Sequence, residues 1–434
     1  MFFSEPSLFP TQSFIFFLQP DMNIWLIIVL AIIIFSFIFE TSLSLLNIKA
    51  LSPDLPKEFE TVYNHAEYQK SQQYTKNLTI FSIIENTWST LLIVTFILCG
   101  GFNWIDKLAR QCGYGEIITG LIFTAILIFL SFLSTLPFSI YSTFVIETKF
   151  GFNTTTPKTF VLDILKGALL AIILGGPLLA LIFWFFQATG VYAWVYCWIG
   201  VVAFSIGIQF IAPVVIMPLF NTFTPLEPGE LKDKILGYSE QEKFKLNGIF
   251  TMDGSKRSTK LNAFFTGFGK FRKIVFFDTL TKELSPDEIV AVLAHEMGHF
   301  KLKHIIKMMG LSIIQTGFMF FLLSLFLTMP EVSQAFRLEQ PSIYASLVFF
   351  GFLYSPINLF ISIAANILSR KHEFEADAYA SATTGQSSQL ITSLKKLSRA
   401  NLSNLTPHPL YVFFHYSHPP LLQRINRLSP GVTS

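Results

Sequence analysis

The sequence is poor in charged residues and in cysteine, and both shortages narrow the class of protein. Only 14% of the 434 residues are Asp, Glu, Lys or Arg, whereas a typical soluble domain carries about 25%. The net charge of +3 argues against a nucleic-acid partner, because such proteins concentrate basic residues on one face. The three cysteines are Cys99, Cys112 and Cys197. They form an odd set without metal-ligand spacing, which predicts neither a disulfide framework nor a cysteine-based metal site.

The sequence is instead rich in apolar residues, which make up 52% of it and include 49 phenylalanines. This composition predicts an integral membrane protein. Apolar runs long enough to cross a bilayer, or nearly so, fall at roughly 22–44, 80–101, 117–141, 166–188, 191–217, 304–329 and 344–369. We therefore predict seven transmembrane helices in a multi-pass protein.

The distribution of basic residues predicts the orientation of these spans. With seven spans, the loops near 45–79, 142–165 and 218–303 and the tail after 369 share one side of the membrane. Nearly all of the 31 Lys and Arg residues fall on that side. The other side holds only Lys107, Arg110 and Arg337. Because Lys and Arg accumulate in cytoplasmic loops, we expect the basic side to face the cytoplasm.

The most informative motif of the chain is His-Glu-Met-Gly-His at 295–299. On an α-helix, His295 and His299 lie four apart on one face, so both imidazoles can bind the same zinc ion. Glu296 lies about 100° round the helix, beside the open coordination position, where peptide hydrolysis needs a general base. The motif is short, however, and two histidines with local hydrogen bonds on a half-buried helix produce the same pattern.

The residues before the motif predict a helix that begins at Ser285. Ser285 and Glu288 have the spacing of a capping box, with Pro286 at the first helical position. The apolar residues that follow, at the spacing of one buried face, are Ile289, Val292, Leu293 and Met297. Gly298 lets another backbone approach close to the site. Three short strands are predicted before this helix, at 248–252, 260–265 and 273–277.

A catalytic zinc ion needs a third protein ligand and keeps one position open. The tail after the last span returns to the side of the motif, and there Glu373 and Asp377 lie four apart on a predicted helix. Glu373 is the natural third ligand, and Asp377 is placed to hydrogen-bond a ligating histidine. A solvated acidic face explains the same segment equally well. His372 and Glu375 are competing ligands, although they point away from the face that holds Glu373.

The chain resembles the type I CAAX prenyl endopeptidases, which are integral-membrane zinc metalloproteases. The resemblance rests on the motif at 295–299 and on Glu-Phe-Glu-Ala-Asp at 373–377, and it extends over most of the chain. Other segments similar to that family are Glu147–Asn153, Pro218–Asn221, Asp253–Ser258 and His415–Pro420. It implies an α-helical membrane protein whose seven spans form a chambered barrel. A zincin-like metalloprotease domain, with a small β-sheet and the zinc helix, is then expected on the cytoplasmic side.

The resemblance implies that His295, His299 and Glu373 ligate one Zn²⁺ per chain. Asp377 is expected to support a ligand histidine, and Arg424 is expected to anchor the tail to carboxylates. The chain then divides into a membrane part with spans one to five (1–217), a metalloprotease domain (218–303), spans six and seven (304–369) and a C-terminal part of the catalytic domain (370–434).

The resemblance also implies which residues act on the substrate. Glu296 is expected to activate the water, and His418 to stabilise the oxyanion together with the metal. Asn262, Ala263 and Phe264 are expected to hold an extended peptide as an added β-strand. Without the resemblance to this family, Asn262 would be interpreted as an ordinary polar strand residue. His418 would be interpreted as a structural histidine in a loop.

Three rival interpretations remain. Intramembrane site-two-type proteases carry the zinc motif inside a span and an Asp-Gly signal after it, whereas here charged residues flank the motif and Asp253-Gly254 precedes it. Bacterial HtpX-type stress proteases share the motif but typically have fewer spans. A transporter or scaffold with structural zinc needs a fourth ligand. His304 and His372 are the nearest candidates, and neither has suitable spacing.

Family members cleave farnesylated C-terminal CAAX peptides and release the last three residues. No pattern in the sequence identifies an isoprenyl pocket. The alternative is a bacterial quality-control protease that acts on unprenylated membrane proteins. The membrane is accordingly either a bacterial inner membrane or the endoplasmic reticulum and nuclear envelope. The expected partners are a peptide or protein substrate and the lipid bilayer, with no nucleic acid and no obligate protein partner.

Overall fold

The computed structural model describes residues 23–266, 272–327 and 329–429. Residues 1–22 and 430–434, which belong to the first and last of the four predicted regions, lie outside the described residues. Within the described part, Cys99, Cys112 and Cys197 are free thiols.

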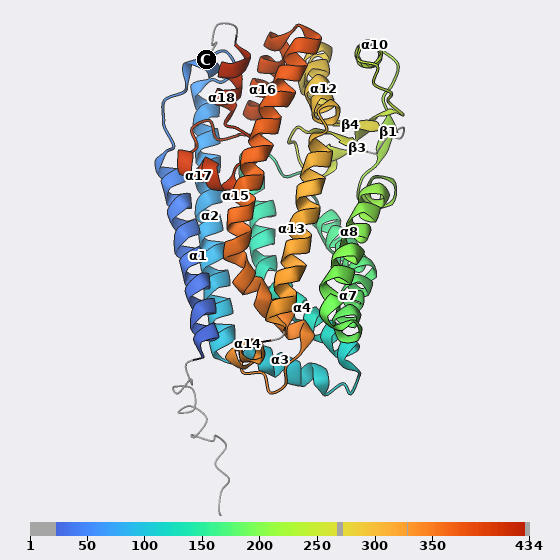
Figure 1. The fold of residues 1–434 in the computed structure, drawn as a ribbon. Helices are drawn as coiled ribbons and strands as arrows, with labels where there is room; N and C mark the ends of the chain where they lie inside the picture. Colours follow the sequence, from blue (N-terminus) through green and yellow to red (C-terminus); the bar gives the residue numbers. More distant parts are fainter. Residues whose placement is uncertain (1–22, 267–271, 328, 430–434) are drawn as a thin grey trace, which may run out of the picture.

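Within the described residues, seven helical segments are long and apolar enough to cross a membrane, and they run along the length of the molecule (Figure 1). These spans are Ile24–Lys49, His65–Leu98, Glu116–Phe150, Pro157–Ala188, Gly190–Phe220, His304–Phe326 and Ile343–Thr384. The seven predicted spans are confirmed, although several helices extend beyond their apolar runs. The helix of the last span, α15 (Ile343–Thr384), continues well past the expected end of that span at 369. It therefore carries the acidic segment at 373–377.

Three spans combine α-helix with a short π-helical turn. The third span consists of α4 (Glu116–Tyr141), the π-helical turn η3 (Ser142–Glu147) and α5 (Thr148–Phe150). The fourth consists of α6 (Pro157–Leu170), the π-helical turn η4 (Ala171–Gly175) and α7 (Gly176–Ala188). The fifth consists of η5 (Gly190–Tyr192), α8 (Ala193–Ile211), the π-helical turn η6 (Ala212–Ile216) and α9 (Met217–Phe220). The uninterrupted spans are α1 (Ile24–Lys49), α2 (His65–Leu98), α13 (His304–Phe326) and α15. The remaining helices are η2 (Lys57–Phe59), α3 (Gly101–Arg110), α10 (Glu230–Gln241), η7 (Gly254–Lys256), α11 (Leu280–Glu283), α12 (Pro286–Lys301), α14 (Pro330–Ala335), α16 (Ser387–Ala400), α17 (Pro409–His415) and α18 (Leu421–Leu428).

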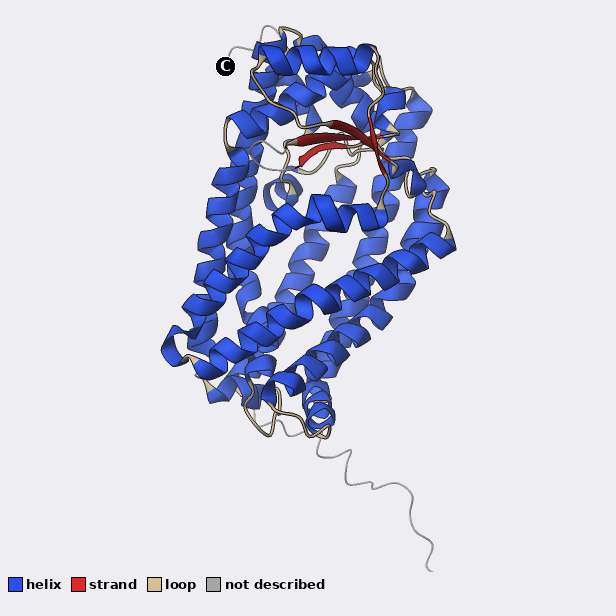
Figure 2. Cartoon of the chain, turned by 90° about the vertical axis from the view of Figure 1, so that its right-hand side faces the viewer, coloured by secondary structure: helices blue, strands red, loops and turns tan. Residues whose placement is uncertain are grey.

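A small mixed sheet lies across one end of the bundle (Figure 2). Its order is β1-β2-β4-β3, with β2 parallel to β4 and the outer strands antiparallel to their neighbours. The strands are β1 (Phe223–Pro225), β2 (Ile249–Met252), β3 (Ala263–Thr266) and β4 (Lys273–Phe277). The three predicted strands are confirmed, and β1 was not predicted. The predicted start of β3 at 260 is wrong, because Asn401 instead binds the backbone N–H and C=O of Leu261, at 2.9 and 3.1 Å.

Helix α12 packs between the sheet and the helices α15 and α16. Ile274 and Phe276 of the sheet, Ile289 and Leu293 of α12, and Leu390 of α16 belong to one buried apolar cluster. Burial of such side chains contributes about 1.5–3 kcal/mol each. This cluster holds α12 against α15. These two helices supply the candidate metal ligands.

The four connections predicted to share one side do lie at the same end of the bundle. Phe59, after α1, packs against Leu405 and Ile425 of the tail. The segment after α5 reaches the domain between α9 and α12 through a β-bridge from Asn153 to Ser258. Helices α3 and α14 lie at the opposite end (Figure 1).

Candidate metal centre and active site

Helix α12 places its two histidines on one face because its start is fixed by a capping box. The N–H of Ser285 donates to Oε2 of Glu288 across 2.7 Å, and the N–H of Glu288 donates to the hydroxyl of Ser285 across 3.4 Å. This confirms the predicted cap. Lys396 of α16 lies 2.8 Å from the Glu288 carboxylate and ties the helix start to the tail. The motif at 295–299 begins nine residues after Pro286 and still lies within the same uninterrupted helix.

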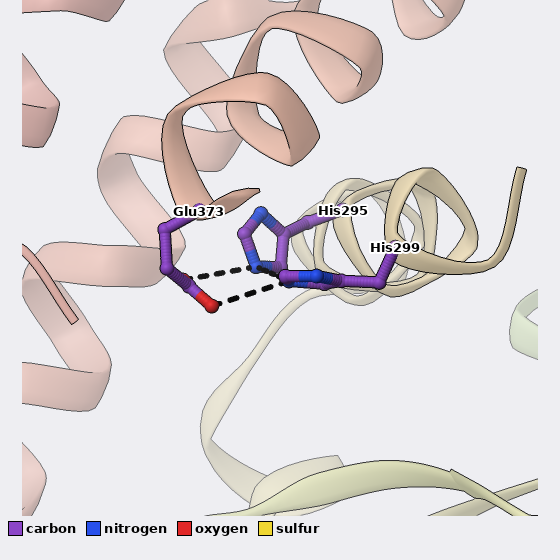
Figure 3. Close-up of side chains that lie close together, drawn as sticks. All are labelled: His295, His299 and Glu373. Atoms are coloured by element: carbon purple, nitrogen blue, oxygen red, sulfur yellow. Dashed lines mark hydrogen bonds and ion pairs between the residues drawn. The ribbon is translucent and has the colours of Figure 1, made fainter. Parts of the chain in front are cut away.

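His295, His299 and Glu373 converge on one point between α12 and α15 (Figure 3). The two Nε2 atoms of the histidines lie 3.2 Å apart. Glu373 Oε2 lies 3.4 Å from Nε2 of His295, and its Oε1 lies 3.2 Å from Nε2 of His299. Two helices that are far apart in sequence thus present two nitrogens and a carboxylate to each other.

The spacing of these atoms fits a bound metal ion. Two ligands of a tetrahedral ion, each about 2.0–2.1 Å from it, lie about 3.4 Å apart, close to the distances found here. The Oε2 atom of Glu373 is buried and accepts no hydrogen bond from a described residue. A buried carboxylate oxygen without a hydrogen bond costs free energy, and a cation among the three side chains removes that cost. The residues present therefore fit a divalent metal ion.

Asp377 and Arg424 support the three side chains from behind. Asp377 Oδ1 lies 2.9 Å from Nδ1 of His295, which directs the Nε2 of that ring toward Glu373. Arg424 on α18 donates to both oxygens of Asp377, from Nε across 2.8 Å and from Nη2 across 2.6 Å. Its Nη1 also lies 3.4 Å from Glu373. One buried guanidinium thus holds both carboxylates, the geometry expected of Arg424 from the sequence.

The carboxylates around His295 favour a positive charge at this position. Burial lowers the pKa of the imidazole, but the neighbouring carboxylates of Asp377 and Glu373 outweigh burial and raise the pKa of His295 to about 9 in the absence of a metal ion. The same two carboxylates that attract a proton attract a cation. A metal ion therefore competes with a proton at the Nε2 of His295.

Glu296 and His418 flank the candidate ligands. The half-buried Glu296 makes no hydrogen bond or ion pair with any residue that the structure describes, so its carboxylate is available to a water molecule. His418 is 64% exposed, and its Nε2 lies 3.3 Å from Oε1 of Glu373. The hydroxyl of Ser417 lies 2.9 Å from Nδ1 of His418. The loop between α17 and α18 thus brings an accessible imidazole to the site.

Asn262, Ala263 and Phe264 lie at the start of β3, an edge strand of the sheet. The exposed Asn262 accepts the N–H of Ala263 with its own side chain, across 2.9 Å. Ala263 packs against the apolar cluster that contains α12. Within the described residues, none of the three makes a hydrogen bond or ion pair with the candidate metal ligands. What they offer is the free edge of a strand.

The structure reveals a second cluster, of His304, His372 and Glu375, that the sequence did not predict. The expectation that His372 and Glu375 point away from Glu373 is consistent with this arrangement. His304 belongs to this second cluster and is not grouped with His295, His299 and Glu373, so its expected lack of suitable spacing for a fourth ligand at that centre stays a prediction. Nδ1 of His304 lies 3.1 Å from Nδ1 of His299, because the chain bends at Lys303, where φ is +59°. On a continuous helix, positions five apart point about 140° away from each other.

Two family models match the chain in succession. The model described as CAAX prenyl protease N-terminal, five membrane helices, matches residues 44–222. The model of peptidase family M48 matches residues 225–431. The second match contains the helices α12, α15 and α18, which carry the candidate ligands and Arg424.

Curated proteins and a solved structure are similar over nearly the full chain. A CAAX prenyl protease 1 homolog of Oryza sativa subsp. japonica is 37% identical, over 92% of this chain and 96% of that protein. CAAX prenyl protease 1 of Saccharomyces cerevisiae is 35% identical, over 93% and 95%. The human CAAX prenyl protease 1 homolog is 32% identical, over 86% and 88%. The crystal structure of S. mikatae Ste24p matches with a TM-score of 0.88 and 34% identity, over 94% of this chain and all of that one.

Proposed function

Because the chain belongs to peptidase family M48 and is an integral-membrane metalloendopeptidase, we propose that it uses zinc to cleave prenylated CAAX-type substrates near their C terminus. The observation that carries the proposal is the convergence of His295, His299 and Glu373 beside the free carboxylate of Glu296. The names of the curated relatives support the substrate class. Release of the C-terminal tripeptide is the expected reaction.

Zinc is the metal that this donor set favours. Two imidazole nitrogens and one carboxylate oxygen are the ligands of several catalytic zinc sites, which leave the fourth position to water or substrate. A structural zinc ion needs a fourth protein ligand. His418 also contacts Glu373, but its side chain is mostly exposed, and it is not grouped with the three candidate ligands among the described residues. We therefore assign the site to catalysis, with one Zn²⁺ per chain.

When bound, zinc polarises the scissile carbonyl and lowers the pKa of the attacking water toward about 7. Glu296 takes a proton from that water as its oxygen bonds to the carbonyl carbon. It then gives the proton to the amide nitrogen as the carbon–nitrogen bond breaks. The His418 imidazole donates a hydrogen bond to the negative oxygen that develops on the former carbonyl. Asp377 and Arg424 keep His295 and Glu373 in position during both steps.

The substrate is held by the free edge of β3. An extended peptide can add to this edge through main-chain hydrogen bonds. Asn262, Ala263 and Phe264 lie at the start of the strand and form that part of the edge. The side chain of Asn262 then has to exchange its bond to the N–H of Ala263 for a bond to the peptide.

The catalytic end of the bundle is proposed to face the cytoplasm. Nearly all Lys and Arg residues lie at that end, and the opposite end holds Lys107 and Arg110, which are paired with acidic residues. The positive-inside rule assigns the basic end to the cytoplasm. The curated relatives come from eukaryotes, which favours the endoplasmic reticulum and nuclear envelope over a bacterial inner membrane.

The proposed substrate class is tested with a pair of peptides that differ only in the farnesyl group. The purified full-length protein in detergent is incubated with each peptide, and the products are identified by mass spectrometry. We expect the farnesylated peptide to lose its last three residues and the unmodified peptide to be cleaved much more slowly. Equal cleavage of both would overturn the prenylated substrate class and favour quality control of unprenylated membrane proteins.

A further inference from the structure

The ligand histidine His299 has an unassigned partner on the side away from the metal centre. Its Nδ1 lies 3.1 Å from Nδ1 of His304, the first residue of α13. The other ring nitrogen of His304, Nε2, lies 2.9 Å from Oε2 of Glu375 on α15. His304 is almost fully buried, at 2% exposure. The three side chains form one line from the carboxylate of Glu375 to the candidate ligand.

The chemistry of the three groups determines where the protons lie. A carboxylate only accepts hydrogen bonds, so Nε2 of His304 must carry a proton that it donates to Glu375. A neutral imidazole has one donor and one acceptor, so Nδ1 of His304 accepts. Nδ1 of His299 must then be the donor. This tautomer leaves the lone pair of His299 on Nε2, the atom that faces Glu373 and His295.

We propose that His304 and Glu375 form a hydrogen-bonded relay that positions His299 for metal binding. The inference rests on the proposed zinc site and adds two positioning residues to it. The relay holds the plane of the His299 ring, selects its Nε2 as the ligand atom and increases the basicity of that atom. Asp377 does the same for His295 from the other side. Each of the two ligand histidines thus has its own carboxylate, one in direct contact and one through His304.

The same residues are poorly arranged for a second metal ion. The rings of His304 and His372 are stacked, with centroids 4.0 Å apart and an angle of 11° between their planes. The lone pairs of stacked, nearly parallel imidazoles lie in parallel planes, so they do not converge on an ion about 2 Å away. Both nitrogens of His304 are already used, by His299 and Glu375. His372 therefore serves as a flat packing surface for His304 and supplies a control.

The relay is tested by metal binding to the full-length protein, which does not depend on finding a substrate. The variants are His304→Phe, which keeps the stacked ring but lacks nitrogens, Glu375→Leu and Glu375→Gln. His372→Phe is the matched control. The dissociation constant for Zn²⁺ is measured by competition with a chromophoric chelator. The visible absorption spectrum of the Co²⁺-loaded protein reports the geometry around the metal, and thermal unfolding of the chelated protein reports folding.

We expect His304→Phe to bind zinc about 10–100-fold more weakly than the unchanged protein, with a shifted cobalt spectrum. Glu375→Leu should behave similarly, and Glu375→Gln should recover most of the affinity because its amide oxygen still accepts from His304. His372→Phe should match the unchanged protein. If His304→Phe does not fold, the relay is tested at the partly exposed position 375. Zinc affinity should then be lower in Glu375→Leu than in Glu375→Gln.

Unchanged affinity and spectrum in His304→Phe and Glu375→Leu would overturn the relay. A second zinc ion per chain that is lost in His372→Phe would overturn it too, in favour of a metal at His304, His372 and Glu375. His295→Ala separates the two proposals. If it retains full zinc affinity, the zinc site itself is wrong; if it loses zinc while His304→Phe does not, only the relay is wrong.

Discussion

Asp377 accepts a hydrogen bond from Nδ1 of His295 across 2.9 Å, and this contact joins α15 to α12 behind the candidate metal centre. Replacing Asp377 by Asn removes the negative charge but keeps the size of the side chain. We expect Asp377→Asn to weaken zinc binding about 10–100-fold, as measured by chelator competition. Asp233→Asn, at an exposed position of α10, should have no effect. Equal affinity in both variants would show that the contact does not support the metal.

Arg424 is buried between the carboxylates of Asp377 and Glu373, so its removal leaves two buried carboxylates with only the His295 imidazole to offset their charge. Breaking one side of a buried ion pair costs about 3–5 kcal/mol. We expect Arg424→Met to lower the thermal unfolding temperature of the chelated protein strongly. Arg427→Met, at an exposed position on the same helix, should leave it nearly unchanged. A similar small change in both variants would contradict the buried role of Arg424.

Gly298 lies where the backbones of α12 and α15 approach closely, as expected from the sequence. A Cβ atom at this position would lie 3.1 Å from Cα and 3.2 Å from the carbonyl oxygen of Ala376. Alanine gains about 1 kcal/mol of helix propensity, but overpacking costs about 1–3 kcal/mol, and the crowded atoms are backbone.

We therefore expect Gly298→Ala to reduce turnover and to lower the unfolding temperature, because α15 must move and takes Glu373 with it. Gly310→Ala is the control, since nothing lies within 4 Å of its added Cβ. An unchanged turnover in Gly298→Ala would show that α15 tolerates the shift.

Zinc affinity should depend on pH through His295. Burial lowers the pKa of His295, but the neighbouring carboxylates of Asp377 and Glu373 raise it to about 9 when no metal is bound. Below that pH the metal has to displace a proton, so affinity should rise by up to about tenfold per unit between pH 7 and 9 and then level off. In the protein freed of metal by a chelator, the raised pKa of His295 also stabilises the folded state. This contribution is fully present below about pH 6.5, the pKa of His295 in the unfolded chain, and is lost as the pH rises through 9. An affinity that does not change between pH 7 and 9 would contradict this assignment.

The sequence predicted the parts of the fold that follow from local chemistry. Apolar runs predicted the seven spans, and the Ser285–Glu288 pattern predicted the start of α12, because membrane crossing and helix capping depend on neighbouring residues. The first strand, Phe223–Pro225, is too short to produce an alternating pattern. The true start of β3 depends on Asn401, which lies far away in the sequence.

The candidate site was predictable where both partners lie on regular helices. His295 and His299 lie four apart on α12, and Glu373 and Asp377 lie four apart on α15. The position of His304 depends on the bend at Lys303, a residue in the left-handed region. No signal in the sequence marks that bend, since Lys rarely adopts a positive φ. The relay to Glu375 was therefore visible only in three dimensions.

The central claim is that Glu296 performs proton transfer while His295, His299 and Glu373 hold zinc. The most direct measurement combines zinc content and cleavage of a farnesylated CAAX peptide in Glu296→Gln, which keeps the size of the side chain but cannot accept the proton as a carboxylate does. The account predicts about one zinc ion per chain and a loss of turnover of at least about 10²-fold. Loss of the zinc ion from this variant, or turnover close to that of the unchanged protein, would contradict it.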